Sequence, residues 1–371
     1  DLELVTTTRW REAEVDVEAI ADDLFPVAMA RPLFSKHIQL FAYDPRPVIA
    51  ALRRHQPRLI DLSHEPYSVA CAEVLTLCNV YAPQATVVMQ ACQNIFHKYP
   101  VPFRWLERRA LNRVAAAYVC SETVREVLVA KGFKKHVEII PFGVNTEAFS
   151  QSGLAKRDPG EPLTIGFVGR MLPGKGLNLL SEALGLLAAE KWKLLVVGDG
   201  SERRSFESSL AAHDLLARAR FTGAVSYEQV PELFRQIDLL VMPTETTERI
   251  REQFGRVLVE AMAGCIPVIG STCGAIPEVI SDAGLVFPEG DAKALAEAIR
   301  RMLSDPELRE RCAVLGKARV EEHYSWDVVA EKTFAFFAQV LAGTAATDGN
   351  IQRARNARVH KLRRNSENAA A

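Results

Sequence analysis

The sequence predicts an α/β protein built from two doubly wound domains. Short β-rich runs alternate with helical patterns along the chain, which is typical of parallel sheets covered on both faces by crossover helices. A break without apolar periodicity comes at Ser150 to Pro162, and a second α/β series begins after it. The chain has 371 residues, 48% of them hydrophobic, which is enough for two cores at roughly 100 to 200 residues per domain.

The first unit, residues 1–150, opens at Asp1 with a run that is typical of a strand already under way, so we expect an earlier element of this domain to be missing. The next expected strands are Ile38 to Leu40, Leu59 to Leu62, Thr86 to Met89, Ala117 to Val119 and Val137 to Ile140. The expected helices lie around Val69 to Asn79 and Trp105 to Val114. Residues 151–162 form the expected linker.

The second unit follows at residues 163–325. Its expected strands are Leu163 to Val168, Lys193 to Val197, Arg220 to Thr222, Leu239 to Val241, Pro267 to Gly270 and Gly284 to Val286. Helical patterns follow them, for example Leu177 to Ala189 and Gln229 to Gln236. Two such sheets joined by a linker leave a cleft between the carboxyl ends of their strands, where these folds bind ligands. The site is therefore expected in that cleft.

Composition excludes several classes of function. Forty-five Lys and Arg against forty-six Asp and Glu give a net charge of −1, so no overall field attracts nucleic acid or an anionic membrane. No apolar run approaches the roughly 18 to 20 residues needed to cross a bilayer. The seven cysteines are odd in number and never spaced as CxxC, and the eight histidines are scattered. We therefore expect a reduced, cytoplasmic protein without a bound metal.

Two segments of the second unit place glycine turns at this cleft. The segment Gly166 to Leu177 holds Arg170 and Lys175 between a strand end and a helix start. Two cations beside helix N–H groups suit a diphosphate, because Arg clamps two oxygens and Lys supplies a point charge. A solvated basic turn explains the pattern equally well, since it is neither a Walker loop nor a GxGxxG fingerprint. The Gly-Asp-Gly turn at Gly198 either lets a ligand approach closely or simply makes a turn.

A third segment contains two acids, Glu252 and Glu260, around a helix start expected at Gly255. Glu260 would lie about 7.5 Å along the axis, at 1.5 Å per residue. A diphosphate on the N–H groups of Phe254 to Val257 would have one carboxylate near each end, and each carboxylate would suit the hydroxyls of a flanking sugar. An acid that favours the helix dipole explains Glu252 as well, but Glu260 has apolar neighbours, where an unpaired acid is costly.

The spacing Glu252-x7-Glu260, with Phe254-Gly255 inside it and Glu-Ala-Met-Ala at its end, resembles the signature of the family 4 glycosyltransferases, a large retaining group with the GT-B fold. Further motifs fall in the family's order within residues 58–342. They are Cys120-Ser-Glu, Ile140-Pro-Phe-Gly-Val-Asn, Gly169-Arg-x4-Lys175-Gly, Val197-Gly-Asp-Gly, Arg220-Phe-Thr-Gly, Ile276-Pro-Glu-Val, Ala283-Gly-Leu-Val-Phe-Pro and Tyr324-Ser-Trp.

The resemblance implies a role for each matching residue. Arg170 and Lys175 would hold the nucleotide diphosphate and neutralise the leaving group, Glu252 would bind hydroxyls of the transferred sugar, and Glu260 would bind the ribose. Other donor-binding positions, contributing mainly backbone groups, are Gly198, Gly223, Val225, Phe254, Gly255, Arg256 and Val257. The family also implies a helix at residues 326–345 that crosses back to the first domain, and catalysis without a bound metal.

The expected reaction is front-face attack by an acceptor hydroxyl, whose proton passes to the leaving phosphate oxygen, as the family implies. Two features of the family are missing here. One is the Gly-rich loop that opens its first domain, and the other is a His after the strand at Thr86 to Met89. Gln93 or Asn94 would take the place of this His by hydrogen bonding, although neither can act as a titrating base.

Two further segments of the first unit concern the acceptor. His64 and Glu65 follow a strand end and should line the cleft, and a turn satisfied by its own contacts is an equal alternative. A basic and aromatic segment, His97 to Trp105, leads into a helix with further arginines. It could rest on an anionic membrane, but we favour a solvated helix packed by its aromatic residues.

We therefore expect a metal-independent, retaining hexosyltransferase that uses a UDP- or GDP-sugar as donor substrate and has no tightly bound cofactor. The acceptor would be a carbohydrate, a lipid-linked sugar or a small molecule, in bacterial glycan, glycolipid or natural-product glycoside synthesis. The alternatives are a non-catalytic nucleotide-sugar-binding protein and a GT-B nucleotide-sugar epimerase. We expect a monomer or homodimer that binds no nucleic acid, located in the cytoplasm or peripherally on the inner face of the membrane, with a disordered basic tail at residues 346–371.

Overall fold

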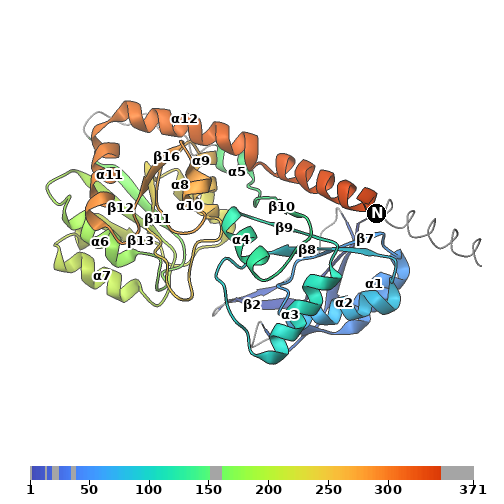
Figure 1. The fold of residues 1–371 in the computed structure, drawn as a ribbon. Helices are drawn as coiled ribbons and strands as arrows, with labels where there is room; N and C mark the ends of the chain where they lie inside the picture. Colours follow the sequence, from blue (N-terminus) through green and yellow to red (C-terminus); the bar gives the residue numbers. More distant parts are fainter. Residues whose placement is uncertain (1, 13–14, 19–24, 35–38, 151–160, 344–371) are drawn as a thin grey trace, which may run out of the picture.

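The computed structural model describes residues 2–12, 15–18, 25–34, 39–150 and 161–343. Most of the expected linker and the whole of the expected basic tail lie outside these residues. The chain forms two lobes, one from its N-terminal part and one from its C-terminal part, as Figure 1 shows.

A four-stranded parallel sheet forms the centre of the N-terminal lobe, in the order β10-β9-β8-β7. Its strands are β7 (Leu59–Leu62), β8 (Thr86–Ala91), β9 (Ala116–Val119) and β10 (Val137–Ile139). The helices of this lobe are α1 (Pro45–His55), α2 (Val69–Tyr81), α3 (Val101–Arg113) and α4 (Glu122–Ala130). The next helix, α5 (Thr146–Phe149), packs against the C-terminal lobe. The parallel register, with Ala91 beside Val119, brings the carboxyl ends of β8 and β9 to one edge.

Three two-stranded sheets complete the described part of this lobe. They pair β1 (Leu4–Thr7) with β4 (Val27–Ala30), β2 (Arg9–Glu12) with β3 (Val15–Glu18), and β5 (Pro32–Leu33) with β6 (Ala42–Tyr43). The first pair is parallel and the other two are antiparallel. Asp44 directly follows the short β6 and caps α1, because its side chain accepts a hydrogen bond from the N–H of Arg46.

A six-stranded parallel sheet forms the C-terminal lobe, in the order β13-β12-β11-β14-β15-β16. Its strands are β11 (Leu163–Val168), β12 (Trp192–Val197), β13 (Ala219–Phe221), β14 (Leu239–Met242), β15 (Val268–Ser271) and β16 (Gly284–Phe287). Its helices are α6 (Leu177–Gly185), α7 (Arg203–Ala212), η2 (Leu216–Arg218), η3 (Tyr227–Gln229), α8 (Val230–Phe234), α9 (Arg256–Ala263), α10 (Ile276–Ile280), α11 (Ala292–Ser304) and α12 (Pro306–His323). The strand order reverses between β11 and β14, which is the switch point at which doubly wound sheets bind ligands.

Burial explains why these strands read as continuous apolar runs. All four residues of β9 and all four of β14 are buried, because helices cover both faces of each sheet and leave no solvent face for polar residues. The core of the C-terminal lobe packs β11, β12 and β14 against α6, α7 and α11, with Ile165, Leu194, Leu180, Phe206 and Ile299 fully or almost fully buried.

Most predicted strands of both units are confirmed within one or two residues. The strand predicted at Ile38 to Leu40 is wrong, because residues 39 and 40 lie in a turn and residue 38 is outside the described part. The helix predicted at Leu177 to Ala189 ends early, at Gly185, since glycine weakens a helix interior. The helix predicted at Gln229 to Gln236 is α8, preceded by the 3-10 turn η3.

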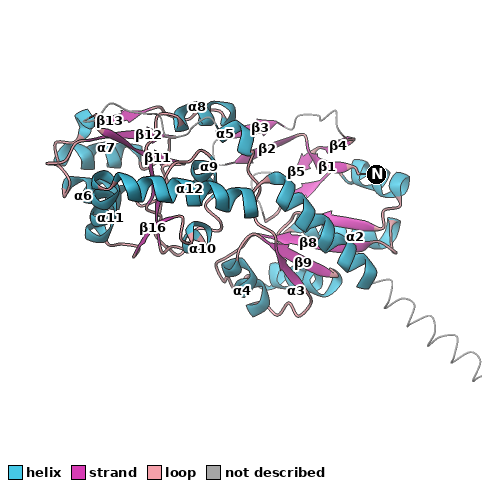
Figure 2. Ribbon diagram, turned by 90° about the horizontal axis from the view of Figure 1, so that it is seen from above, coloured by secondary structure: helices cyan, strands magenta, loops and turns pink. Residues whose placement is uncertain are grey.

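The chain crosses between the lobes at two adjacent places. The first crossing follows β10, and the second follows α12, where the N–H of Val144 donates to the carbonyl of Tyr324 at 2.9 Å. Residues 326–343 then form a helix on the N-terminal lobe, as Figure 2 shows. Its apolar contacts with the sheet join Val329, Phe336 and Val340 to Val88, Tyr118 and Ile140. The last helix therefore completes the core of the other lobe.

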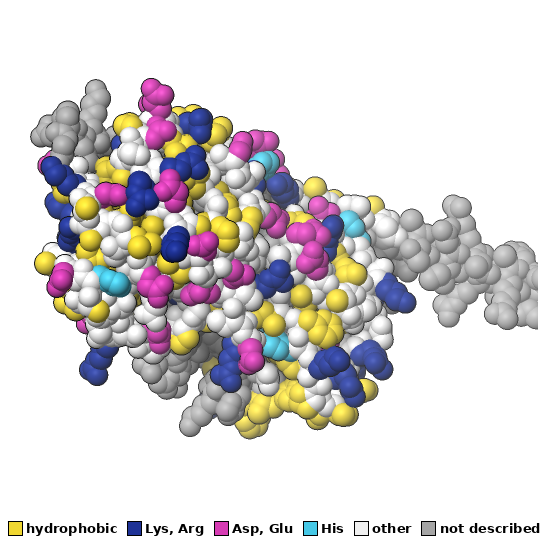
Figure 3. All heavy atoms as spheres, turned by 60° about the vertical axis from the view of Figure 1, so that its left-hand side comes forward, with side chains coloured by type: hydrophobic (Ala, Val, Ile, Leu, Met, Phe, Trp, Pro, Cys, Tyr) yellow, Lys and Arg dark blue, Asp and Glu magenta, His cyan; other side chains and the backbone are white. Residues whose placement is uncertain are grey.

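The surface carries charges of both signs. On the face that Figure 3 shows, acidic and basic side chains are interspersed over most of the molecule, in keeping with the net charge of −1. Among the described residues, no helix has both the length and the apolar character needed to cross a bilayer.

Candidate functional site

The loops after β11 and β14 meet at the switch point of the C-terminal sheet. The N–H of Glu245 donates to the carbonyl of Gly174 at 2.8 Å. Gly176 has a φ of +70°, and a Cβ atom there would lie 1.8 Å from the carbonyl oxygen of Pro243. Only glycine fits such a close approach of two backbones. This contact fixes the position of Lys175, which lies between the two glycines in sequence.

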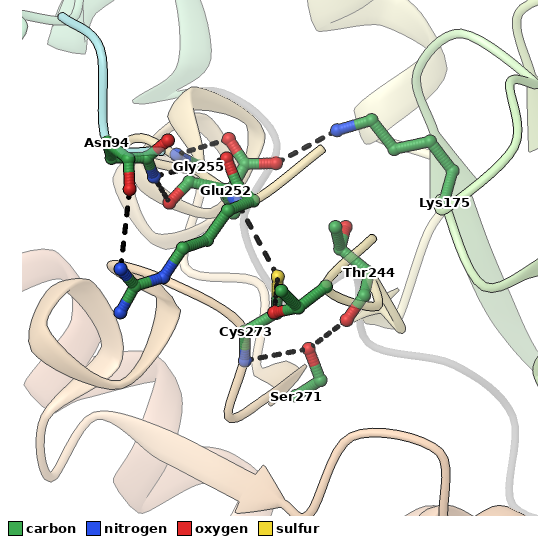
Figure 4. Close-up of polar contacts among 9 residues, drawn as sticks. Asn94, Lys175, Thr244, Glu252, Gly255, Ser271 and Cys273 are labelled. Atoms are coloured by element: carbon green, nitrogen blue, oxygen red, sulfur yellow. Dashed lines mark hydrogen bonds and ion pairs between the residues drawn. The ribbon is translucent and has the colours of Figure 1, made fainter. Parts of the chain in front are cut away.

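Lys175 and Glu252 form the centre of the candidate site. The Nζ atom of Lys175 lies 2.9 Å from Oε2 of Glu252, and the two side chains are 25% and 14% exposed. The other carboxylate oxygen of Glu252 accepts a hydrogen bond from the N–H of Gly255 at 3.1 Å. Figure 4 shows these contacts at the start of α9. A cation, a carboxylate and a helix N-terminus therefore converge at one place.

The first turn of α9 is held by aromatic packing. Gly255 has a φ of +87° and is the N-cap residue. Phe254 is buried, and its ring packs edge-on against Phe142 and Tyr324, with centroid distances of 5.4 and 5.6 Å. The exposed Arg256 lies over the ring of Phe142, at 5.4 Å, and Val257 is half-buried. The first N–H groups of an α-helix have no carbonyl four residues before them, so this end suits an anion.

Glu260 lies one turn further into α9 and is 5% exposed. Its Oε1 atom accepts a hydrogen bond from the hydroxyl of Tyr227 at 3.2 Å. Burial raises the pKa of Glu260 to about 7, while Tyr227 and Arg256 act in the opposite direction. Burial also raises the pKa of Tyr227, to about 12. The acid is thus buried against a neutral hydroxyl, an environment that disfavours its charged form.

The turns after β11, β12 and β13 contact one another at the carboxyl edge of the C-terminal sheet. The N–H of Gly198 donates to the carbonyl of Gly223 at 3.0 Å. A Cβ atom on Gly198 would lie 2.1 Å from the carbonyl oxygen of Gly169. Val225 is half-buried against the core, and Arg170 is exposed in the turn after β11. The predicted donor-binding positions therefore surround one edge of the sheet.

Three of the four predicted acceptor-side residues have their contacts within the N-terminal lobe. His64 Nε2 lies 2.8 Å from the hydroxyl of Tyr43, and burial lowers the pKa of His64 to about 4. Glu65 accepts a hydrogen bond from the N–H of Cys92 at 2.8 Å, and burial raises the pKa of Glu65.

Gln93 is likewise engaged by its own lobe. Its Nε2 atom donates to the hydroxyl of Tyr99 at 2.6 Å, and its Oε1 atom accepts from Nζ of Lys131 at 3.0 Å. Lys131 also pairs with Glu107. These contacts hold the amide inside an aromatic and charged cluster of the N-terminal lobe.

Asn94 is the fourth of these residues, and its contacts reach the other lobe. Its side chain is buried, and Nδ2 donates to the carbonyls of Arg251 and Glu252 at 3.1 and 2.8 Å. The backbone carbonyl of Asn94 accepts a hydrogen bond from Nη1 of Arg251 at 3.3 Å. The sequence brought Asn94 into consideration as an acceptor-side residue and gave no sign of this contact.

Sequence reasoning also missed Tyr227 and Ser121. Tyr227 follows Ser226, whose hydroxyl forms a capping box with Gln229, so the Ser-x-x-Gln spacing was the available signal. Ser121 donates to the carbonyl of Gln253 at 2.8 Å. This contact joins the two lobes, and no local sequence pattern predicts it. Within the described ranges, no group of three or more His, Cys, Asp or Glu side chains is arranged to hold a metal ion.

Comparisons with known proteins agree with this architecture. Residues 154–319 match the model for glycosyl transferases group 1, and residues 1–148 match the model for Glycosyltransferase Family 4. The chain is 30% identical over 287 residues to the 2-deoxystreptamine glucosyltransferase of Streptomyces kanamyceticus, covering 72% of this chain and 66% of that protein. It is 27% identical over 323 residues to the sulfoquinovosyl transferase of Arabidopsis thaliana, covering 81% of this chain but only 60% of that protein's length.

Solved structures show the same fold. Sucrose-phosphate synthase from Thermosynechococcus elongatus superposes with a TM-score of 0.66 at 20% identity, covering 92% of this chain and 89% of that chain. Anabaena HepE in complex with UDP superposes with a TM-score of 0.68 at 16% identity, covering 85% and 86%. These neighbours are GT-B proteins, and the two family models span both lobes described above. The chain has the GT-B fold and belongs to the family 4 glycosyltransferases of group 1.

Proposed function

We propose that this chain is a retaining glycosyltransferase that moves a hexose-type sugar from a UDP- or GDP-sugar to an acceptor hydroxyl. The observation that carries the proposal is the convergence of Lys175 and Glu252 at the N-terminus of α9. A cation and a helix N-terminus suit a diphosphate, and a carboxylate beside them suits the hydroxyls of a sugar attached to it.

The other donor contacts follow from this placement. Arg170 and Lys175 would bind the diphosphate, and Glu260 would accept hydrogen bonds from the ribose hydroxyls, because it lies one turn further along α9 than the phosphate end. The turn that contains Gly223 and Val225 would border the base. In this arrangement the nucleotide lies on the C-terminal lobe, and the sugar faces the N-terminal lobe.

The reaction breaks the bond between the anomeric carbon and the phosphate oxygen and forms a bond between that carbon and the acceptor oxygen. Negative charge grows on the departing diphosphate, and Arg170, Lys175 and the N-terminus of α9 would stabilise it. The proton of the acceptor hydroxyl passes to the leaving phosphate oxygen on the same face of the sugar. The products are a nucleoside diphosphate and a glycoside with the donor's configuration, and no step needs a metal ion.

Relatives named for their substrates support both choices of donor. One similar protein is the GDP-mannose-dependent alpha-mannosyltransferase of Mycobacterium tuberculosis, at 26% identity over 343 residues. Glucosyl transfer appears in the name of the Streptomyces relative, and structural neighbours were solved with UDP and with UDP-glucose. We therefore propose a glucose- or mannose-type sugar on UDP or GDP.

We further propose that the N-terminal lobe contacts an anionic membrane surface, in place of the solvated helix packed by its aromatic residues that the sequence favours. The surface around α3 exposes Phe96, Val101 and Trp105, at 47%, 67% and 59%, with the exposed Arg104 and Arg108 among them. Apolar side chains between arginines suit an anionic bilayer surface. Sedimentation with anionic vesicles tests this point, and equal recovery of Trp105→Ala and the unmodified protein in the pellet would contradict it.

The proposed function is tested by thermal stabilisation with UDP, GDP, ADP and their common sugar derivatives. A ligand that binds only the folded state raises its apparent stability, and Arg170→Ala should reduce the shift. Product analysis then separates the alternatives. Transfer or hydrolysis releases free nucleoside diphosphate, an epimerase keeps it in the sugar nucleotide, and a binding protein releases nothing. No shift at millimolar ligand would sink the proposal.

A further inference from the structure

Three consecutive carbonyls of the loop before α9 accept hydrogen bonds from side chains of the N-terminal lobe. Nδ2 of Asn94 donates to the carbonyl of Arg251 at 3.1 Å and to that of Glu252 at 2.8 Å. Oγ of Ser121 donates to the carbonyl of Gln253 at 2.8 Å. We call Asn94 and Ser121 the interlobe clamp. They follow the carboxyl ends of β8 and β9, which the parallel register brings together.

Both clamp side chains are buried, with Asn94 2% exposed and Ser121 1% exposed. A buried polar group that loses its partner costs more than a hydrogen bond contributes when made. The clamp therefore favours one position of the loop strongly. If the lobes moved apart, the carbonyls of Arg251 and Gln253 and the two side chains would lose these partners, whereas the carbonyl of Glu252 would keep the N–H of Ala275.

The C-terminal lobe holds the opposite side of the same loop. The N–H of Ala275 donates to the carbonyl of Glu252 at 3.0 Å, and the N–H of Glu252 lies 3.4 Å from Sγ of Cys273. Gly274 has a φ of +59°, and a Cβ atom there would lie 2.0 Å from the carbonyl oxygen of Glu252. The backbone of Glu252 is thus enclosed by both lobes, as Figure 4 shows in part.

We propose that Asn94 and Ser121 are positioning residues that set the Glu252 carboxylate against the transferred sugar. The inference rests on the proposed function, in which Glu252 binds sugar hydroxyls. The groups assigned to the nucleotide, Arg170, Lys175 and Glu260, all belong to the C-terminal lobe. Nucleotide binding therefore does not depend on the clamp, whereas recognition of the sugar does.

This arrangement couples the two substrates. The clamp comes from the lobe that carries the acceptor side, and it acts on the loop that carries the donor-sugar carboxylate. The clamp adds the last constraint on the Glu252 loop, so recognition of the sugar is completed when the lobes are in contact. The clamp thus acts through Glu252 and touches neither substrate.

The experiment compares Asn94→Ala and Ser121→Ala with the unmodified protein. Calorimetry gives the Kd for UDP and UDP-glucose, or for GDP and GDP-mannose, whichever pair the unmodified protein binds. We expect Asn94→Ala to change the Kd of the nucleoside diphosphate less than about twofold, while kcat falls about tenfold or more, the scale of two lost hydrogen bonds. The difference in affinity between the nucleotide sugar and the nucleoside diphosphate, which measures the contribution of the sugar, should fall together with kcat.

The control is Thr76→Ala, because it removes a hydroxyl of the same lobe that donates only locally, to the carbonyl of Ala72 within α2 at 2.7 Å. It should behave like the unmodified protein. Ser121→Thr keeps the hydroxyl and should restore most of the activity that Ser121→Ala loses. This pair of variants tests the clamp even if Asn94→Ala does not fold.

The outcomes separate two failures. An unmodified protein that binds no nucleoside diphosphate would overturn the proposed function itself. A protein that binds and turns over, but whose clamp variants lose nucleotide and nucleotide-sugar affinity equally, or lose neither affinity nor turnover, would overturn the positioning role alone. A fall in kcat with unchanged nucleotide affinity supports it.

Discussion

Nζ of Lys175 lies 2.9 Å from Oε2 of Glu252, although 77 positions separate the two residues in the chain. The pair joins the loop after β11 to the loop after β14 across the switch point of the sheet. Under the proposed function, a bound diphosphate competes with Glu252 for the ammonium group. Donor binding would then leave the carboxylate available for the hydroxyls of the sugar.

This competition predicts opposite effects of two substitutions. Lys175→Met should weaken binding of the nucleoside diphosphate about tenfold or more, because a charge-assisted hydrogen bond contributes about 1.5–3 kcal/mol. Glu252→Gln should leave that affinity unchanged or higher and lower kcat instead. Calorimetry and steady-state kinetics measure the two quantities. Parallel losses in both variants would show that the two side chains act as one structural pair.

Replacing Glu260 by Gln should change how stability depends on pH. The pKa of Glu260 rises from 4.5 to about 7 on folding, so between these values the folded state holds a proton that the unfolded chain has lost. The free energy of unfolding therefore falls as the pH rises through this window, by up to about 3 kcal/mol. Urea denaturation of both proteins at pH 5 and pH 8 measures it. A constant difference between them would contradict the burial argument.

Tyr227→Phe should move the same transition upward. The Tyr227 hydroxyl donates to Glu260 and lowers its pKa, so without it the carboxyl keeps its proton to a higher pH. The pH at which stability stops falling is then expected above that of the unmodified protein. Denaturation at closely spaced pH values between 6 and 9 would reveal the shift, and an unchanged midpoint would mean that this hydrogen bond does not form in solution.

Gly176→Ala should destabilise the protein more than Gly132→Ala. Both glycines have positive φ, +70° and +95°, and that conformation costs an L-residue about 1–2 kcal/mol. At Gly132 a Cβ atom meets nothing within 4 Å, whereas at Gly176 it would lie 1.8 Å from the backbone of Pro243. Chemical denaturation of both variants isolates the effect of the clash. Equal costs would mean that the two loops separate easily.

Phe336→Ala should destabilise the protein by about 3–5 kcal/mol, because Phe336 is 2% exposed against the N-terminal sheet. Phe334, two positions earlier in the same helix, is 74% exposed. Its replacement by Ala should change stability by about 0.5 kcal/mol or less. The pair tests whether the last helix is docked in solution as described, since an undocked helix would make the two substitutions equivalent.

Local patterns predicted most of the fold, including the turns and the helix start at which the proposed donor-binding residues lie. β11 has the predicted bounds, because a buried parallel strand is a continuous apolar run between turn residues. The helix start at Gly255 was also predictable, because a helical apolar pattern begins directly after this glycine. The strand predicted at Ile38 to Leu40 is wrong. In this part of the chain the strands are short and pair two by two, so their positions depend on the partner strand and not on a local apolar pattern.

Contacts between lobes could not be predicted in this way. The partners of Asn94 are backbone carbonyls 157 and 158 positions away, and a carbonyl carries no sequence signal. The hydrogen bond from Tyr227 to Glu260 spans 33 positions and joins a short 3-10 turn to a helix. Such pairs arise from the placement of whole lobes and loops, which local propensity does not determine.

The two crossings of the chain between the lobes have a mechanical consequence. They lie side by side, with Val144 bonded to Tyr324 and Gly143 packed so closely on Trp326 that a Cβ atom would lie 2.3 Å from its ring. Because the two crossings are held together, a backbone change at one of them is passed directly to the other. We therefore expect any hinge movement between the lobes to be centred on these residues, so that a small rotation there displaces atoms far from the crossings by a larger distance.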